Sequence, residues 1–331
     1  MKVLKFGGTS VGTPARMKEV ARLITENSEQ KIVVLSAMSG TTNTLVEIAD
    51  YLKKGNREAA NSVINKLRAK YMTHTKELHA AEEWVIKTSD FLEDEFMYLH
   101  SFSGTEFTAT TEKTILAQGE MMSTNMVTNY LKEIGIKVML IPALDYMMTD
   151  KNGEPDLAYI ENNLKAILNE NPNYDIYITQ GFICRDAEGR IDNLQRGGSD
   201  YTASLIGAAL GADEIQIWTD IDGMHNNDPR FVENTSPVSH LHFEEAAELA
   251  YFGAKILHPT CIQPAKFAGI PVKLLNTMDP TAPGTVISNK TEKNKIKAVA
   301  AKDNIIAINI TSSRMLLAYG FLRKVFEIFE T

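Results

Sequence analysis

Cysteine is scarce in this sequence: only Cys184 and Cys261 occur among 331 residues. Two thiols cannot build the disulfide framework of a small secreted domain, and these two lack the spacing of metal ligands. The sequence also has no uncharged stretch long enough to span a bilayer, and its first residues do not form a basic and apolar leader. These absences predict a reduced, cytoplasmic protein that has no membrane partner.

An excess of basic residues is also missing, because 34 Lys and Arg stand against 42 Asp and Glu, which gives a formal charge of -8. This balance argues against a nucleic-acid partner, which would favour a basic face. It does not exclude anionic substrates, since local side chains and helix ends decide how these bind. A chain that is 44% hydrophobic and 23% charged is long enough for one large α/β domain and an accessory piece.

The opening segment, Met1–Phe6, surrounds two lysines with apolar residues and predicts a strand that enters a core. Gly7 and Gly8 follow directly, ahead of an amphipathic run that predicts a helix. In such a unit the backbone N–H groups and the helix N-terminus converge on an anion. Glycines let the main chain approach a phosphate, and Lys5 places an ammonium nearby. The segment predicts a phosphate site; a tight turn with a solvent-facing lysine is the alternative.

Two common nucleotide motifs are excluded at this turn. A Walker A loop has its lysine after the glycines, whereas Lys5 precedes Gly7 and Gly8. No Gly-x-Gly-x-x-Gly pattern follows the strand either, so a dinucleotide-binding fold is disfavoured.

A second strand-to-helix unit follows the first. The apolar run Lys31–Ser36 is typical of a buried parallel strand, and a small hydroxyl-rich turn separates it from the next helix. Two such units in succession predict a doubly wound sheet, in which ligands gather at the carboxyl ends of the strands. The segment Ala59–Glu133 predicts a helical region beside this sheet. Further strands are expected at Lys137–Pro142, Asp175–Gly181, Glu214–Thr219 and Pro271–Leu275.

Two charged groups stand near predicted helix starts. Glu120 precedes a helix expected over Met121–Leu131, where a carboxylate in the first turn would gain from the helix dipole. Asp200 follows a second double glycine and is expected to cap the helix Tyr201–Gly211. For each residue, helix capping is the alternative to a functional role.

A polar, charged linker near residues 289–295 separates the last part of the chain. Beyond it the pattern predicts a strand pair, Ile296–Ala301 and Ile305–Thr311, and a helix, Met315–Glu330. One strand pair and one helix form half a module, so the apolar face of that helix needs a sheet that too few strands remain to provide. Association through this face is expected.

Several segments, in order, resemble signatures of the amino acid kinase superfamily and, within it, of the aspartate kinases. They are KFGGTSV (5–11), VLSAMSGTTN (34–43), QGE (118–120), RGGSDYTA (196–203) and WTDIDG…DPR (218–230), with FGAKILHP (252–259) and NT…APGT (276–285) as support. The resemblance covers Met1 to about Val286 and implies a three-layer αβα sandwich with a mainly parallel open sheet. It implies a catalytic domain at 1–290, whose N-terminal part binds aspartate and whose residues from about 200 to 290 bind the nucleotide.

The tail, 296–331, resembles the beginning of the first ACT repeat, a regulatory amino-acid-binding module of α+β structure. The resemblance therefore implies a monofunctional form that is truncated within this repeat, with no fused homoserine dehydrogenase. Feedback control by lysine or threonine is expected to be lost or blunted, because paired ACT modules cannot form. The full-length form is expected to be a homo-oligomer, specifically a dimer.

The family transfers the γ-phosphoryl group of ATP to the side-chain carboxylate of L-aspartate, which gives 4-phospho-L-aspartate, the first step toward lysine, threonine and methionine. Mg²⁺ is implied, held chiefly by ATP oxygens, since the sequence shows no dedicated carboxylate cluster and no metal-binding residues are predicted. The resemblance assigns catalytic roles to Lys5, Gly7, Gly8 and Asp200. It assigns aspartate binding to Ser36, Thr42, Glu120, Arg196 and Ser199. It assigns ATP binding to Lys5, Gly8, Ser10, Thr219, Asp220, His225, Arg230 and Lys255.

Two positions depart from the family pattern: Gln195 stands where a glycine is usual, and the segment with His225 lacks the usual tyrosine. These two differences are expected to affect the kinetics with the substrates more than the groups that carry out the chemical step. Two alternatives stay open. One is a related kinase that acts on glutamate, acetylglutamate, carbamate or UMP, and the other is a non-catalytic amino-acid-binding protein that keeps the fold.

Overall fold

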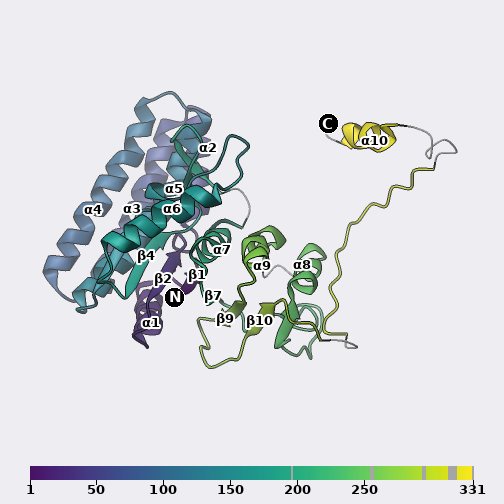
Figure 1. Cartoon of the computed structure of the whole chain (residues 1–331). Helices are drawn as coiled ribbons and strands as arrows, with labels where there is room; N and C mark the ends of the chain where they lie inside the picture. The colour runs from purple at the N-terminus through teal and green to yellow at the C-terminus, as the bar shows by residue number, and fades with distance from the viewer. Residues whose placement is uncertain (195–196, 254–256, 293–295, 312–318, 330–331) are drawn as a thin grey trace. The chain divides into compact units, whose positions relative to one another are not determined.

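The computed structural model describes residues 1–194, 197–253, 257–292, 296–311 and 319–329. Within these ranges the chain forms an eight-stranded sheet in the order β3-β4-β2-β1-β7-β9-β10-β8, and a two-stranded hairpin, β5-β6 (Figure 1). The strands of the large sheet are β1 Lys2–Phe6, β2 Lys31–Leu35, β3 Val138–Ile141, β4 Ile176–Gln180, β7 Glu214–Thr219, β8 His240–His242, β9 Val272–Asn276 and β10 Thr285–Ser288. The hairpin strands are β5 Ile183–Arg185 and β6 Ile191–Asn193. Only the β9–β10 pair of the large sheet is antiparallel.

Strand β1 lies at the centre of the sheet, with β2 on one side and β7 on the other, both parallel to it. In this register Phe6 pairs with Leu35 and with Trp218, so the three strands end at the same level. The Gly7 N–H donates to the Trp218 carbonyl at 3.1 Å, and the Ser36 N–H donates to the Phe6 carbonyl at 3.2 Å. The turns that follow these strands therefore meet at one edge, as parallel pairing requires.

Helices cover both faces of the sheet, which makes three layers (Figure 1). Alternate residues of each central strand enter opposite cores: Val3 lies in one hydrophobic cluster, while Leu4 and Phe6 lie in the other. The first cluster packs against α6 Leu157–Glu170, α7 Gly198–Leu210, α8 Phe243–Tyr251 and α9 Gln263–Ala268. The second packs against α1 Pro14–Thr25, α2 Thr41–Lys53, α3 Arg57–Leu78, α4 Glu82–Ser101 and α5 Ala109–Glu133. The predicted αβα sandwich with a mainly parallel sheet is confirmed.

The helical region predicted over Ala59–Glu133 is present as α3, α4 and α5, but the expected start of its last helix is wrong. α5 begins at Ala109, where Thr108 forms a capping box with Thr111, so Glu120 lies in mid-helix and not in a first turn. The Gln118-Gly119 step does not interrupt the helix, since its neighbours satisfy the i→i−4 ladder. Packing explains the glycine at position 119, because a Cβ there would stand 2.8 Å from the Cβ of Ala37.

The predicted N-cap of α7 is also wrong. The helix begins at Gly198, and Gly197, at φ 69°, occupies the cap position. Asp200 lies in the first turn, where its carboxylate still interacts favourably with the helix dipole.

The strand pair predicted in the tail does not form: the described residues 296–311 contain no strand. A strand needs a partner for its backbone groups, and the side chains of Ile305 and Ile306 are largely exposed. A helix is present as α10 Phe321–Phe329, while residues 312–318 and 330–331 of the predicted helix lie outside the described residues. Met1–Ala300 and Ala301–Thr331 are separate compact units, and the proposed ACT-like identity of the tail stays a prediction.

The sequence pattern did not predict β10 or the edge strand β8 beside it, because each has only three or four residues. Among the described helices, none combines the length and the apolar character needed to cross a membrane.

Replacement of Phe96 tests the helical core. Its side chain is buried and contacts the Tyr71 ring edge-on, with centroids 5.8 Å apart. Phe96→Ala should lower the free energy of unfolding by about 3–5 kcal/mol in urea titrations, because the change leaves a cavity. Met97→Ala, at an exposed neighbour, should change it by less than about 0.5 kcal/mol. Equal losses in the two variants would contradict this packing.

Candidate active site

An ion pair stands at the carboxyl end of the central strand. Lys5 of β1 places Nζ 2.6 Å from Oδ1 of Asp200 in the first turn of α7, and the two side chains are 11% and 18% exposed. Such limited exposure strengthens the attraction relative to a surface pair and holds the lysine in one orientation. The two residues are 195 positions apart in sequence (200 − 5), and the fold brings their side chains into contact.

The glycine turn after β1 packs tightly on the turn after β2. The Ser39 N–H donates to the Gly8 carbonyl at 3.0 Å, and a Cβ on Gly8 would stand 2.7 Å from the Ala37 carbonyl oxygen. Glycine is therefore required at position 8 by close backbone approach. The Gly7 N–H is engaged by the Trp218 carbonyl, whereas Gly8 lines the cavity described below.

Ser10 is completely buried, and its hydroxyl is 2.7 Å from the hydroxyl of Thr277. This contact ties the first turn to the end of β9. The structure thus places Ser10 beneath the site, and its contact with ATP stays a prediction.

A cavity of about 450 Å³ opens at this edge of the sheet. Its walls come from the turns after β1, β2, β4 and β7 and from the middle of α5. Six of the predicted site residues line it, namely Gly8, Ser36, Thr42, Glu120, Ser199 and Asp220. The sequence segments that these residues occupy are thus brought to one place, as the doubly wound topology predicts.

Glu120 is the most unusual group in this cavity. Its side chain is 4% exposed, and Oε2 has no hydrogen-bond partner among the described residues. Burial raises the pKa of this carboxyl to about 8, against a smaller lowering by the backbone N–H groups of Ala37 and of Glu120 itself. A buried carboxylate without a cationic partner is costly, so this position is suited to receive a cation from a ligand.

Hydroxyl groups form another part of the cavity wall. The Ser36 hydroxyl donates to the Ser199 hydroxyl at 2.9 Å, and the Ser123 hydroxyl donates to the Ser36 carbonyl at 2.8 Å. Gly181 lets Ser199 approach, because a Cβ at Gly181 would stand 2.8 Å from the Cα of Ser199. The hydroxyls are therefore held by backbone and side-chain bonds before any ligand binds.

Sequence reasoning missed Phe182, which lines the same cavity. Its φ of 68° is rare for a residue with a side chain, and the Thr202 hydroxyl holds this backbone by accepting from the Phe182 N–H at 2.9 Å. The available signal was its position directly after Gly181, the glycine that follows β4.

Residues predicted to bind the nucleotide lie partly at this cavity and partly beyond it. Asp220 lines the cavity and accepts from the Thr219 hydroxyl at 3.2 Å. The imidazole of His225 lies between Asp222 and Thr235, with 2.8 Å to each. Neither His225 nor Arg230 lines the cavity.

Arg230 is largely exposed and pairs with Asp228, with 3.0 Å between Nε and Oδ1. Hydrogen bonding to Asp228 raises the pKa of Arg230 above its ordinary value. Three further positions, Gln195, Arg196 and Lys255, lie outside the described residues, and their predicted contributions are untested.

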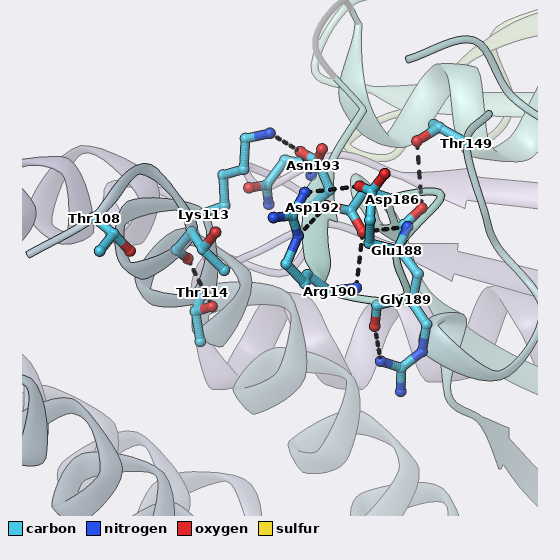
Figure 2. A network of polar contacts seen from close by, with 12 residues as sticks. Thr108, Lys113, Thr114, Thr149, Asp186, Glu188, Gly189, Arg190, Asp192 and Asn193 are labelled. Carbon is cyan, nitrogen blue, oxygen red and sulfur yellow. Dashed lines mark hydrogen bonds and ion pairs between the residues drawn. The ribbon is translucent and has the colours of Figure 1, made fainter. Parts of the chain in front are cut away.

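A second ion pair, which the sequence did not suggest, joins the β5–β6 hairpin to α5 (Figure 2). Lys113 of α5 lies 2.6 Å from Asp192 of β6. Lys113 precedes Glu120 by two helical turns, and Asp192 precedes Arg196 by four residues. The pair therefore fixes the strand that leads to Arg196 against the helix that carries Glu120. At the hairpin tip, Arg190 pairs with Asp186 at 2.7 Å.

No group of three or more His, Cys, Asp or Glu side chains is positioned to hold a metal ion in the part of the chain that the structure describes.

Comparison with known proteins agrees with this geometry. The family model described as "Amino acid kinase family" matches residues 1–276. Aspartokinase 3, chloroplastic, of Arabidopsis thaliana is 38% identical over 99% of this chain and 60% of its own length. Lysine-sensitive aspartokinase 3 of Escherichia coli K12 is 35% identical over 98% of this chain and 73% of its own length.

Solved structures give the same result. The crystal structure of E. coli aspartokinase III in complex with aspartate and ADP superposes with a TM-score of 0.84 at 33% identity, and covers 100% of this chain and 74% of that chain. The complex of the same enzyme with lysine and aspartate gives a TM-score of 0.79 at 32% identity. The chain therefore belongs to the amino acid kinase family and, within it, to the aspartokinases. It spans about three-fifths of the length of the Arabidopsis relatives that it matches.

The raised pKa of Glu120 predicts a pH dependence of stability. The folded protein holds a proton here that the unfolded chain releases near the ordinary glutamate pKa, so the contribution to unfolding free energy is full in acid and is lost as pH rises toward about 8. Glu120→Gln should therefore gain stability relative to the parent protein between pH 5 and 8, measured by urea unfolding. Glu112→Gln, at a half-buried position of the same helix, is the control. An unchanged difference across this range would contradict the assignment.

Proposed function

We propose that this chain is an aspartate kinase, which transfers the γ-phosphoryl group of Mg-ATP to the side-chain carboxylate of L-aspartate and forms 4-phospho-L-aspartate and ADP. The observation that carries the proposal is the Lys5–Asp200 pair, which stands beside the glycine turn after β1, while Gly8 of that turn lines the cavity that contains Glu120. The similar E. coli enzyme, whose structure was solved with aspartate and ADP, supports the choice of substrates.

Phosphoryl transfer requires that the charge of the migrating group is neutralised and that the reacting groups are aligned. In phosphoryl transfer, negative charge spreads over the oxygens of the migrating group, and positioned cations and N–H donors stabilise it. Lys5 supplies the cation, Asp200 holds it in place, and the Gly8 N–H supplies a donor. The attacking carboxylate of aspartate is already ionised, so the reaction requires no general base.

The cavity offers a complementary group for each charge of aspartate. Glu120 would accept the ammonium, and this new ion pair would favour the ionised form of a carboxyl whose pKa is raised to about 8 in the empty cavity. Arg196 would clamp a carboxylate with its planar fork. Ser199, Ser36 and Thr42 would donate hydroxyl hydrogen bonds, and Thr42 stands in the first turn of α2, where the helix dipole favours an anion.

ATP would lie on the side of the sheet edge formed by the ends of β7 and β9. Thr219 and Asp220 would contact the nucleoside, while Arg230 and Lys255 would hold phosphates and His225 would contact the base. Mg²⁺ would enter bound to ATP oxygens, since the described chain has no cluster of its own for a metal.

Three broader statements belong to the same proposal. The product would be the first intermediate on the way to lysine, threonine and methionine. The reaction would take place in the cytoplasm, although the similar plant proteins are named chloroplastic. The full-length form would be a homodimer.

A hydroxamate assay for the acyl phosphate, with aspartate and Mg-ATP, tests the proposal. Lys5→Ala should lower kcat by on the order of 10²-fold or more, because the migrating charge loses its cation. Lys2→Ala provides the matched control, since Lys2 lies on the same strand and pairs with Glu29 at 2.6 Å, away from the cavity. An active Lys5→Ala protein would refute the assigned role.

A panel of acceptors separates the alternatives. ADP release should be strong with aspartate and weak with glutamate, acetylglutamate, carbamate and UMP, because Glu120 and the hydroxyl wall fit one short amino dicarboxylate. Turnover of glutamate without turnover of aspartate would overturn the proposal. Failure to bind Mg-ATP in isothermal titration would instead favour a non-catalytic binding protein.

A further inference from the structure

Residues 297–299 follow the linker and lie against the nucleotide half of the first compact unit. Lys297 is extended inward: its side chain is 8% exposed, and Nζ donates to Oε2 of Glu245 at 2.8 Å. Ala298 packs against the hydrophobic cluster below α8, and the Val299 N–H donates to the Asn226 carbonyl at 2.9 Å. We call residues 297–299 the clasp, because each of its ends is attached to a different element.

The first attachment fixes the start of α8. The carboxylate of Glu245 accepts from the His242 N–H at 2.7 Å, which closes the capping box of this helix, and accepts from Lys297 through the same oxygen. Burial would raise the pKa of Glu245, but the bonds from Lys297 and the His242 N–H outweigh it and hold the pKa below its ordinary value. The helix ends at Tyr251, four residues before Lys255 along the chain.

The second attachment extends a ladder in the loop after β7. The Asn226 N–H donates to the Ser236 carbonyl, and the Ser236 N–H donates to the Asn226 side chain, each at 2.9 Å. The Val238 N–H donates to the Met224 carbonyl at 2.7 Å. His225 lies between Met224 and Asn226 in the chain. The segment 224–226 is therefore bonded to residues 236–238 and, through the Asn226 carbonyl, to Val299.

We propose that the clasp positions the two nucleotide-binding elements and thereby sets the affinity for ATP, with Lys297 as a positioning residue that does not touch substrate. The inference rests on the proposed function, since Lys255 and His225 are proposed ATP contacts. Among the described residues, the hydrogen bonds of the clasp go to the α8 region and the loop after β7, whereas Glu120 and Ser36 come from α5 and the turn after β2. Loss of the clasp contacts therefore lowers the affinity for the nucleotide and leaves the affinity for aspartate unchanged.

Isothermal titration of Mg-ADP into the full chain measures this effect directly. Lys297→Met keeps the aliphatic stem but removes the charge, and should raise the Kd by about three- to thirtyfold, the range typical of positioning contacts. Lys297→Arg should restore most of the affinity. Glu245→Gln keeps the helix cap but weakens the pair, and should raise the Kd less.

Two matched controls accompany these variants. Lys266 of α9 pairs at 3.4 Å with Glu244, which neighbours Glu245 on α8 but is exposed. Lys266→Met should therefore leave the Kd unchanged. Val299→Pro removes the N–H that bonds to Asn226 and should raise the Kd, whereas Val299→Ala, which keeps that N–H, should not.

Steady-state kinetics complete the test, because a merely structural role would move every parameter. The clasp predicts that Lys297→Met raises KM for ATP and leaves KM for aspartate unchanged. An unchanged Kd in both Lys297→Met and Val299→Pro, or an equal rise of both KM values, would overturn the inference. A chain that shows the Lys297 dependence of nucleotide binding but does not phosphorylate aspartate would refute the proposed function and support the clasp. If the chain phosphorylates aspartate but its nucleotide affinity does not depend on Lys297, the proposed function is supported and the clasp is refuted.

Discussion

The parallel pairing of β1 with β2 and β7 is the constraint on which the rest of the structure depends. Parallel strands that end at the same level bring their following turns to one edge of the sheet. At this edge Lys5 meets Asp200, and Gly8 lines the cavity. Because β1 is the central strand and its side chains enter both hydrophobic cores, the position of Lys5 is set by most of the packing in the domain.

Close approach of backbones gives the cavity its shape. Gly8, Gly119 and Gly181 each stand where a Cβ would collide with the neighbouring turn or helix. The contact at Gly119 allows α5 to pass directly under the turn after β2, and this brings Glu120 to the cavity floor. The cost is a buried carboxyl group whose Oε2 has no hydrogen-bond partner among the described residues, and the packing of the surrounding helices must offset this cost. Stability and ligand binding are therefore opposed at this residue, as is common at functional sites.

The residues proposed for the two substrates come from different parts of one domain. Glu120, Ser36 and Thr42 come from the first strands and from the helices that pack on them, whereas His225 and Lys255 belong to the segments after β7. The Lys113–Asp192 pair holds the first region to the hairpin that leads to Arg196, and the clasp holds the second. Each region thus has an anchor outside the cavity, and the anchors share no residue.

The sequence by itself determined the class of the fold, the family and six of the residues that line the cavity. Strand runs, glycine turns and helical periods are local patterns, and a parallel sheet must place the ends of its strands together, so Gly8, Ser36 and Ser199 could be assigned to one edge before any coordinates were known. Local pattern failed where the outcome depends on distant partners. The start of α5, the cap of α7 and the two tail strands were predicted wrongly, since a helix extends or a strand forms according to what packs beside it.

Only the tertiary structure decided how the polar groups are used. It showed that Glu120 is buried in mid-helix, that Ser10 is bonded to Thr277, and that Phe182 forms a wall. It also paired Lys113 with Asp192 and Lys297 with Glu245. The sequence alone does not distinguish these lysines from lysines on the surface. Burial and charge pairing arise between segments that are far apart in sequence and that meet only when the sheet is assembled.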